Sequence, residues 1–151
     1  MADEPKQAHP ESAASELVEP DWTKGVETEK RSGMRSEVSN AMVGLKKNFY
    51  GKGPTKAKTY INDNYVLCVL QGGLTRNEET MLEAGEDMLV RQFRLRFQEV
   101  MAAPATEAIQ RLTGRKVIGY HSQITFRPDY AFEIFVLDEA PRVTRQRLTD
   151  P

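Results

Sequence analysis

The sequence predicts an α+β domain with a four-stranded, mainly antiparallel sheet that carries its helices on one face. Three observations predict this architecture. Apolar residues recur at steps of three and four near residue 40, which indicates an amphipathic helix, and a longer repeat of the same kind follows residue 86. A pair of short segments of strand-like composition follows each helical pattern. The expected order is therefore helix, strand, strand, helix, strand, strand.

The first helix is expected from about Met34 to Tyr50, with Ser32 as its N-terminal cap. Its apolar face consists of residues that are four, three and four positions apart: Val38, Met42, Leu45 and Phe49. Gly51 and Pro54 follow this face directly. Because glycine suits a left-handed C-cap and proline cannot continue a helix, the helix is expected to end there.

The first strand pair is expected directly after this helix. Residues 57–62 alternate in polarity, as in a strand with one exposed face. Residues 65–70 are apolar on both faces, which is typical of a central strand. The turn residues Asn62-Asp63-Asn64 join the two segments, so they predict neighbouring strands.

The middle of the chain predicts a short helix followed by a long one. Thr75 and Glu78 have the spacing of a capping box, so a helix is expected from there to about Glu83, with a break near Gly85. The long helix is expected over 86–113. Its predicted buried stripe is Leu89, Phe93, Phe97, Val100, Ala108 and Leu112, widened by Met101 and Ile109. Pro104 lies inside this helix and is expected to kink it or to split it in two.

The last hairpin has the clearest strand signal, because residues 117–126 and 131–137 are rich in β-branched and aromatic side chains. Residues 127–130 are expected to join them, with Pro128 at the second position of a type I turn.

A sheet with helices on one face leaves its other face bare. We expect this bare face to carry Lys58, Tyr60, Tyr120 and Ser122. An exposed sheet face of this size is often an interaction surface, and two copies of a chain can cover it by symmetric association. The sequence therefore predicts a homodimer.

The domain organisation follows from composition. Residues 1–32 contain eight acids against four bases, three prolines and few large apolar residues, so they predict a disordered acidic leader. Within it, residues 16–22 have the acidic and aromatic character of a docking motif, and Trp22 is the candidate partner-binding residue; a linker with a chance tryptophan is the simpler interpretation. The folded domain is expected over 33–139, and residues 140–151 predict a flexible C-terminal tail.

The composition also predicts the compartment. The single cysteine, Cys68, cannot form an internal disulfide, whereas small secreted domains usually carry an even number of cysteines. No apolar stretch approaches the roughly 18–20 residues needed to span a bilayer, and the acidic N-terminus lacks the features of a signal peptide. We expect a soluble, cytoplasmic protein without direct membrane insertion.

Basic residues are too few and too dispersed to predict a nucleic-acid partner. The net charge is −1, and the chain after the leader carries only 17 bases against 14 acids. The densest basic groups are Lys46, Lys47, Lys52, Arg91, Arg94 and Arg96, which we expect on solvated, salt-bridged faces. Single-stranded nucleic acid is bound by bases interleaved with exposed aromatic rings, and the nearby Phe93 and Phe97 belong to the predicted buried stripe.

No motif predicts catalysis, a metal or a cofactor. Gly51-Lys52-Gly53-Pro54 follows a helix, whereas a phosphate loop follows a strand and begins a helix. A helix C-cap is the favoured interpretation, and a nest of backbone N–H groups that holds a small anion with Lys52 and Gly53 is the alternative. His121 and Ser122 adjoin in a strand and face opposite ways, which excludes a catalytic triad built on both. A metal site would need two or three more ligands than are visible.

Several motifs together resemble a known family. They are the run Asn48-Phe49-Tyr50-Gly51-Lys52-Gly53-Pro54, the strand pair Thr59-Tyr60-Ile61 and Tyr65-Val66-Leu67, Gly73-Leu74-Thr75 with Glu78, Leu112-Thr113-Gly114-Arg115-Lys116-Val117, His121-Ser122, and Phe135-Val136-Leu137-Asp138. This pattern resembles the MpsC-like domain, a small bacterial family named after component C of a sodium-translocating, membrane-potential-generating system. Arg76, where such proteins often have proline, and Arg127-Pro128-Asp129, in place of a glycine-containing turn, depart from the family pattern.

The resemblance implies a small cytosolic domain, found alone or beside membrane-transport and signalling partners, with no catalytic residues to carry over. We therefore expect a non-catalytic accessory or regulatory domain that binds proteins or small ligands, linked to membrane transport or membrane potential. The alternative is an anion-binding domain or small enzyme with a site near Lys52, Arg76 and His121, which requires these residues to converge on one pocket. The candidate ligand-binding residues are Lys52, Gly53, Arg76, His121 and Ser122.

Overall fold

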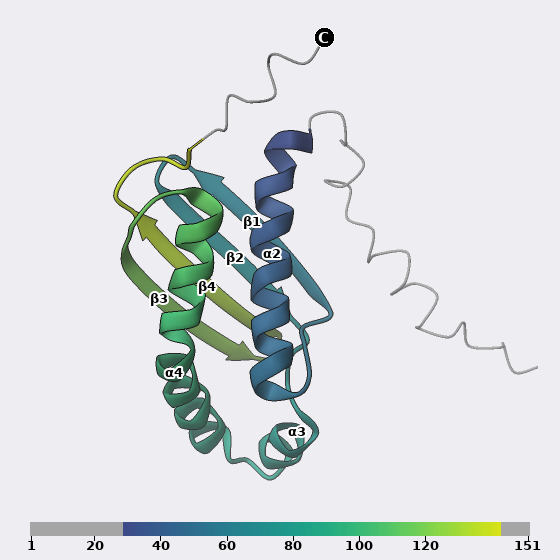
Figure 1. The fold of residues 1–151 in the computed structure, drawn as a ribbon. Coiled ribbons are helices and arrows are strands. Elements are labelled where there is room, and N and C mark those ends of the chain that lie inside the picture. The colour runs from purple at the N-terminus through teal and green to yellow at the C-terminus, as the bar shows by residue number, and fades with distance from the viewer. Residues whose placement is uncertain (1–28, 143–151) are drawn as a thin grey trace, which may run out of the picture.

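The structure is a computed structural model that describes residues 29–142 (Figure 1). The elements are, in chain order, α2 (Glu29–Tyr50), β1 (Lys56–Asn62), β2 (Tyr65–Gln71), α3 (Arg76–Glu83), α4 (Asp87–Thr113), β3 (Val117–Phe126) and β4 (Asp129–Leu137). The predicted α+β class and order of elements are confirmed. The predicted leader before residue 29, with Trp22, and the predicted tail after residue 142 lie outside the described residues.

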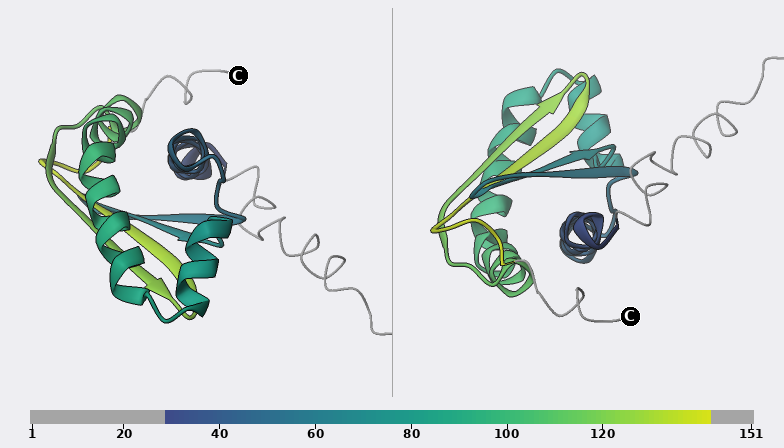
Figure 2. Two further views of the ribbon diagram at one scale, coloured as in Figure 1. Left: turned by 90° about the horizontal axis from the view of Figure 1, so that it is seen from below. Right: turned by 90° about the horizontal axis from the view of Figure 1, so that it is seen from above.

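The four strands form one sheet in the order β1-β2-β4-β3, and all three pairs are antiparallel. The helices lie on one side of this twisted sheet, where α2 packs over β1 and β2 and α4 packs over β3 (Figure 2). We call the side under the helices the covered face and the opposite side the open face. The covered face includes Thr59, Cys68, Glu133 and Ser122, and the open face includes Tyr60, Leu67, Ile134 and His121.

Helix α2 begins at Glu29, which is earlier than the predicted start near Met34. Ser32 therefore lies inside the helix instead of capping it. The Glu-Lys-Arg run that opens the helix consists of good helix formers.

The face and the end of α2 largely follow the sequence pattern. Val38 and Met42 are buried as predicted, whereas Phe49 is exposed near the last turn of the helix. Gly51 has a φ of 77°, and its N–H donates to the Lys47 carbonyl at 2.9 Å. This is the left-handed glycine C-cap that the sequence predicts.

The capping box at the start of α3 is confirmed, because Thr75 and Glu78 make both of its reciprocal bonds. Gly85, with a φ of 81°, separates α3 from α4. Helix α4 is continuous through Pro104, so the predicted split is wrong. Figure 1 shows that the ribbon of α4 bends part-way along its length, as expected where a proline removes one hydrogen bond and the flanking bonds persist.

The buried face of α4 differs from the predicted stripe in the first half of the helix, whereas Met101 and Ile109 are buried as predicted. Its buried residues are Val90, Arg94, Gln98, Met101, Ala105, Ile109 and Thr113. Leu89, Phe93 and Val100 are each more than half exposed. The prediction failed because Arg94 and Gln98 occupy covered positions, and a pattern of apolar residues cannot anticipate that Glu78 on α3 neutralises the charge of Arg94.

The β3–β4 hairpin turns one residue earlier than predicted. Phe126 pairs with Asp129, so the strands are joined by Arg127 and Pro128 alone. The Arg127–Pro128 peptide is cis, and proline occupies the third position of the turn, as in type VI turns, and not the second position of a type I turn.

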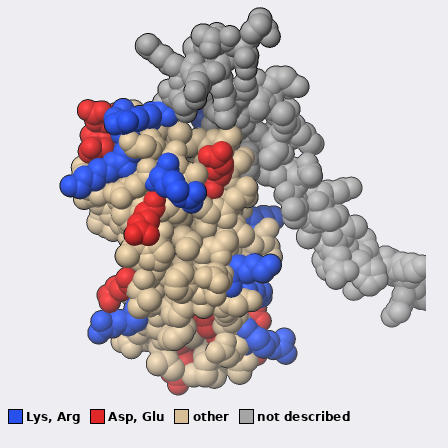
Figure 3. All heavy atoms as spheres, viewed as in Figure 1, with Lys and Arg blue, Asp and Glu red and all other residues tan. Residues whose placement is uncertain are grey.

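Two apolar clusters form the core. The larger contains Val38, Met42, Val66, Cys68, Leu70, Ala105, Ile109, Phe135 and Leu137. The smaller cluster lies at the end of the sheet where β3 joins β4, and contains Leu74, Leu82, Val90, Ile124 and Phe126. Figure 3, seen from the helix side, shows mostly uncharged surface across the middle of the molecule. None of the helices within residues 29–142 is long and apolar enough to cross a membrane.

Candidate functional site

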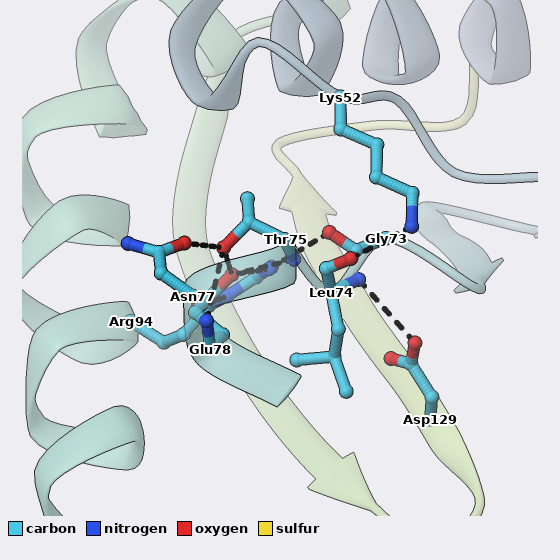
Figure 4. Close-up of polar contacts among 8 residues, drawn as sticks. All are labelled: Lys52, Gly73, Leu74, Thr75, Asn77, Glu78, Arg94 and Asp129. Carbon is cyan, nitrogen blue, oxygen red and sulfur yellow. Dashed lines mark hydrogen bonds and ion pairs between the residues drawn. The ribbon is translucent and has the colours of Figure 1, made fainter. Parts of the chain in front are cut away.

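The loop between β2 and α3 is held by the charged residues Lys52, Glu78, Arg94 and Asp129, which we call the loop clamp (Figure 4). Arg94 Nε donates to Glu78 Oε2 at 2.5 Å. Arg94 Nη2 donates to Glu78 Oε1 at 2.6 Å and to the Gly73 carbonyl at 2.8 Å. This bidentate pair joins α3, α4 and the loop in one contact.

The other two members of the clamp hold Leu74. Lys52 Nζ donates to the Leu74 carbonyl at 2.9 Å, and the Leu74 N–H donates to Asp129 Oδ2 at 3.4 Å. Burial raises the pKa of Asp129 above its usual range, and the bond from Leu74 acts in the opposite direction. The charges of the clamp are thus engaged with the protein's own loop.

The central ion pair of the clamp is buried, since Glu78 and Arg94 are each 5% exposed. Burial opposes ionisation of Glu78, but hydrogen bonds from Arg94 and Thr75 outweigh it and hold the pKa of Glu78 below its usual range. Burial also opposes the charge of Arg94, and Glu78 more than compensates, so the pKa of Arg94 is raised. Both groups therefore stay charged at neutral pH, as a structural pair does.

A cavity of about 20 Å³ lies beside the clamp and has room for a water molecule. Lys46, Tyr50, Arg94 and Asp129 supply its polar lining. The Tyr50 hydroxyl is buried and has no hydrogen-bond partner among the described residues. Burial raises the pKa of Tyr50 to about 12, so the phenol keeps its proton at neutral pH and cannot serve there as a general base.

A polar row crosses the covered face, from β1 to β3. The strand register places its four members side by side: Thr59, Cys68, Glu133 and Ser122. Glu133 is 1% exposed, and its Oε1 lies 2.7 Å from Lys46 Nζ on α2. The Tyr120 hydroxyl donates to Glu133 Oε2 at 2.5 Å. A buried charge is thus paired from α2 and hydrogen-bonded from β3, as the low dielectric of the interior requires.

The protonation states in this row are those of a structural network. Burial, with help from the Glu133 carboxylate, raises the pKa of Tyr120 well above its usual range. Burial also raises the pKa of Cys68 to about 12. Because the thiolate and not the thiol is the nucleophile, Cys68 is unreactive at neutral pH.

The open face is apolar along its two central strands. Tyr65, Leu67 and Val69 on β2 lie beside Val136, Ile134 and Phe132 on β4 in register. Tyr65 is 53% exposed and Ile134 is 36% exposed, while no helix among the described residues packs over them. These six side chains form a continuous apolar block on the uncovered face of the sheet.

A second exposed apolar region lies on the helix side. Leu89, Phe93, Phe97 and Val100 on α4 form a stripe at helical spacing, and the Phe49 ring on α2 meets the Phe97 ring edge-on at 6.2 Å. Phe93 is 52% exposed, so its predicted burial is wrong and does not speak against a nucleic-acid partner. The low net charge is the remaining sequence observation against such a partner.

The structure does not bring the predicted ligand-binding residues together. Lys52 belongs to the loop clamp, Gly53 packs against the Lys47 side chain, and Arg76 is exposed in the first turn of α3. His121 is exposed on the open face, whereas Ser122 lies on the covered face with its hydroxyl buried and unpartnered among the described residues.

Two predicted positions on the bare face are also wrong. Lys58 and Tyr60 lie on the open face as expected. Tyr120 and Ser122 point toward the helices instead, because each is paired in register with a buried residue of β4, Phe135 or Glu133.

The interpretation of Arg94 as part of a solvated face is corrected by its burial against Glu78. Arg91 likewise donates to the Ile124 carbonyl at 2.9 Å.

Sequence reasoning missed the two buried ion pairs, Glu78–Arg94 and Lys46–Glu133. The only local signal for the first is the capping box, which places Glu78 at a fixed position in α3. The only signal for the second is an acid in the apolar run of β4, where Glu133 stands between Phe132 and Ile134. Among residues 29–142, no three His, Cys, Asp or Glu side chains lie close enough together to hold a metal ion.

Comparison with known proteins gives a family match over the described fold. The family model described as "Na+-translocating membrane potential-generating system (MpsC)" matches residues 30–139. Uncharacterized protein YrhF of Bacillus subtilis (strain 168) is 25% identical over 104 residues, which cover 68% of this chain and 85% of that protein. Uncharacterized protein YbcI of the same organism is 27% identical over 108 residues, which cover 71% and 87%. No solved structure matches the chain.

Proposed function

The chain belongs to the MpsC family, and from this premise we propose that it is a non-catalytic accessory or regulatory domain that works by contact with proteins, beginning with a second copy of itself. The observation that carries this proposal is the open face, with its block of six apolar side chains on β2 and β4. The charged groups described above favour the absence of catalysis, because they pair with one another and with the protein's own backbone.

Symmetric association of two open faces accounts for this surface. Two antiparallel sheets pack face to face at about 10 Å with interdigitating side chains. The apolar block lies on the two central strands, and Lys58 and His121 lie on the edge strands, so the block would be buried and the polar groups would form the rim. An interface with an apolar centre and a polar rim is the usual arrangement.

The family's description supports a link to membrane transport or membrane potential. We infer that the dimer's further partner is a transport or signalling protein and that the domain acts in the cytoplasm. The single buried cysteine is consistent with a reducing compartment, since the sequence offers no disulfide. The alternative, a site for small anions or catalysis near Lys52, Arg76 and His121, has no support from the placement of these residues.

The proposal is tested by sedimentation equilibrium of the full chain and of Ile134→Asp. We expect a reversible dimer for the unmodified chain and a monomer with unchanged circular dichroism for the variant, because two buried like charges would oppose each other across the interface. The matched control is Phe93→Asp, which places the same charge on the stripe of α4. A chain that is monomeric at every concentration would contradict the proposal, and dissociation by Phe93→Asp alone would move the interface to α4.

A further inference from the structure

Among the described strand residues, the open face carries basic and apolar groups but no acid. Lys56 and Lys58 lie on its β1 side, and none of the strand residues on this face is acidic within the described part of the chain. Lys58 Nζ lies 5.0 Å from the centre of the Tyr60 ring, which is 47% exposed. A segment that binds here should combine acids with aliphatic or aromatic side chains.

The chain contains such a segment shortly before α2. Residues 16–22 read Glu-Leu-Val-Glu-Pro-Asp-Trp, which is three acids, no base, two aliphatic side chains and the only tryptophan of the protein. Its charge is opposite to that of the β1 side of the open face. Its leucine, valine and tryptophan side chains are suited to pack against the exposed Tyr60 ring on that side.

This segment is also near enough to reach the open face. The hydroxyls of Ser39 on α2 and Thr59 on β1 are 2.7 Å apart and set the two elements side by side. From this contact, the start of α2 is about 15 Å along the helix, and Asn62 is about 10 Å along the strand. Figure 1 shows both at the same end of the molecule. The residues from Trp22 to the start of α2 can span up to about 25 Å, and β1 is an edge strand that the chain can pass.

We propose that residues 16–22 dock on the open face beside β1, with Trp22 against the Tyr60 ring and the acids against Lys56 and Lys58. This inference rests on the proposed function, because a leader docked beside β1 occupies the rim of the surface through which two copies associate and blocks the approach of a second copy. If the leader covers the face in about nine chains of ten, the apparent Kd of the dimer rises about 100-fold, since both faces must be free. The leader is then a built-in competitor that regulates self-association.

Trp22 is an intrinsic probe for this contact, because its fluorescence is the only tryptophan signal of the full chain. In dilute, monomeric samples we expect blue-shifted emission that is protected from acrylamide quenching. Lys56→Glu/Lys58→Glu should shift the emission to that of a solvated tryptophan, and high salt should act in the same direction by screening the charges. The matched control is Arg96→Glu, an exposed charge reversal on α4 that should leave the emission unchanged.

Self-association gives the second readout. The neutral leader variant Glu16→Gln/Glu19→Gln/Asp21→Asn should dimerise at a lower concentration than the unmodified chain. Solvated Trp22 emission in the unmodified chain, or equal emission in the Lys56→Glu/Lys58→Glu variant, would overturn the inference. If either of these fluorescence results is found while Ile134→Asp still abolishes the dimer, the leader contact is wrong and the proposed function stands. If no dimer forms but Trp22 is protected by the open face, only the proposed function fails.

Discussion

The two faces of the sheet both depart from a simple division into a buried apolar side and an exposed polar side. The covered face, which is sealed by α2 and α4, contains a carboxylate and a row of hydroxyl and thiol groups, while the open face presents a block of apolar side chains to solvent. On the covered face the buried Glu133 has Lys46 of α2 as its partner, and beside the sheet Glu78 of α3 pairs with Arg94 of α4. Burial of charged groups at the covered face therefore depends on specific pairs. On the open face, by contrast, we expect that apolar side chains can be replaced without loss of the fold.

The two phenylalanines of β4 give the largest expected contrast. Phe135 is fully buried on the covered face, and Phe132 lies on the open face. We expect Phe135→Ala to lower the free energy of unfolding by about 4 kcal/mol, because it leaves a cavity in the core. Phe132→Ala should cost about 1 kcal/mol in the monomer. Urea unfolding measures both, and equal costs would contradict the distinction between the faces. The cost of Phe132→Ala should grow with protein concentration if the open face is the dimer contact.

Removing one partner of the buried ion pair in the polar row should have the next largest effect. Lys46→Met leaves the Glu133 carboxylate buried without its cation, and we expect a loss of about 3 kcal/mol in the free energy of unfolding. The double variant Lys46→Met/Glu133→Gln should recover most of this loss, because the unpaired charge is gone. A double variant as unstable as the single one would show that the pair itself, and not the orphaned charge, stabilises the fold.

Conservative replacement in the loop clamp should have a smaller effect. Arg94→Lys keeps the charge beside Glu78 but loses the planar, bidentate geometry and the bond to the Gly73 carbonyl. We expect a loss of about 2 kcal/mol by thermal or urea unfolding. The matched control is Arg96→Lys, whose exposed pair with Glu99 should change stability by less than about 0.5 kcal/mol.

The smallest expected effect is the acid sensitivity that Glu78 contributes. Its folded-state pKa lies below that of the unfolded chain, so its stabilisation is present above the unfolded pKa of about 4.3 and is lost as the pH falls through the folded pKa. We expect the free energy of unfolding to fall as the pH passes through this window. Unfolding at a series of pH values should show a flatter acid limb for Glu78→Gln. Asp129→Asn should not flatten it, because the raised pKa of Asp129 has the opposite sign.

Local chemistry predicted much of the fold. Three features were predicted correctly: the capping box of Thr75 and Glu78, the C-cap at Gly51 and the alternation of β1. Each depends only on residues a few positions apart, so it can be recognised from the sequence alone. In the first half of α4 the buried stripe was predicted one position out, because Arg94 is stabilised in its buried place by Glu78, a residue 16 positions away. The candidate site shows the same limit. The bare sheet face was predicted, but Tyr120 and Ser122 were assigned to it, since the sequence pattern alone did not say which of β3's faces the helices would cover.

By itself, the sequence determined the class of the domain, the order of its elements and the presence of an uncovered sheet face, because periodicity, caps and turns act over short distances along the chain. Only the tertiary structure decided which side chains share a face and which charges meet. Those pairings join residues far apart in sequence, such as Lys46 with Glu133, and their energy depends on burial that exists only once the helices lie on the sheet. The open face is defined in the same way, as the surface that this packing leaves uncovered.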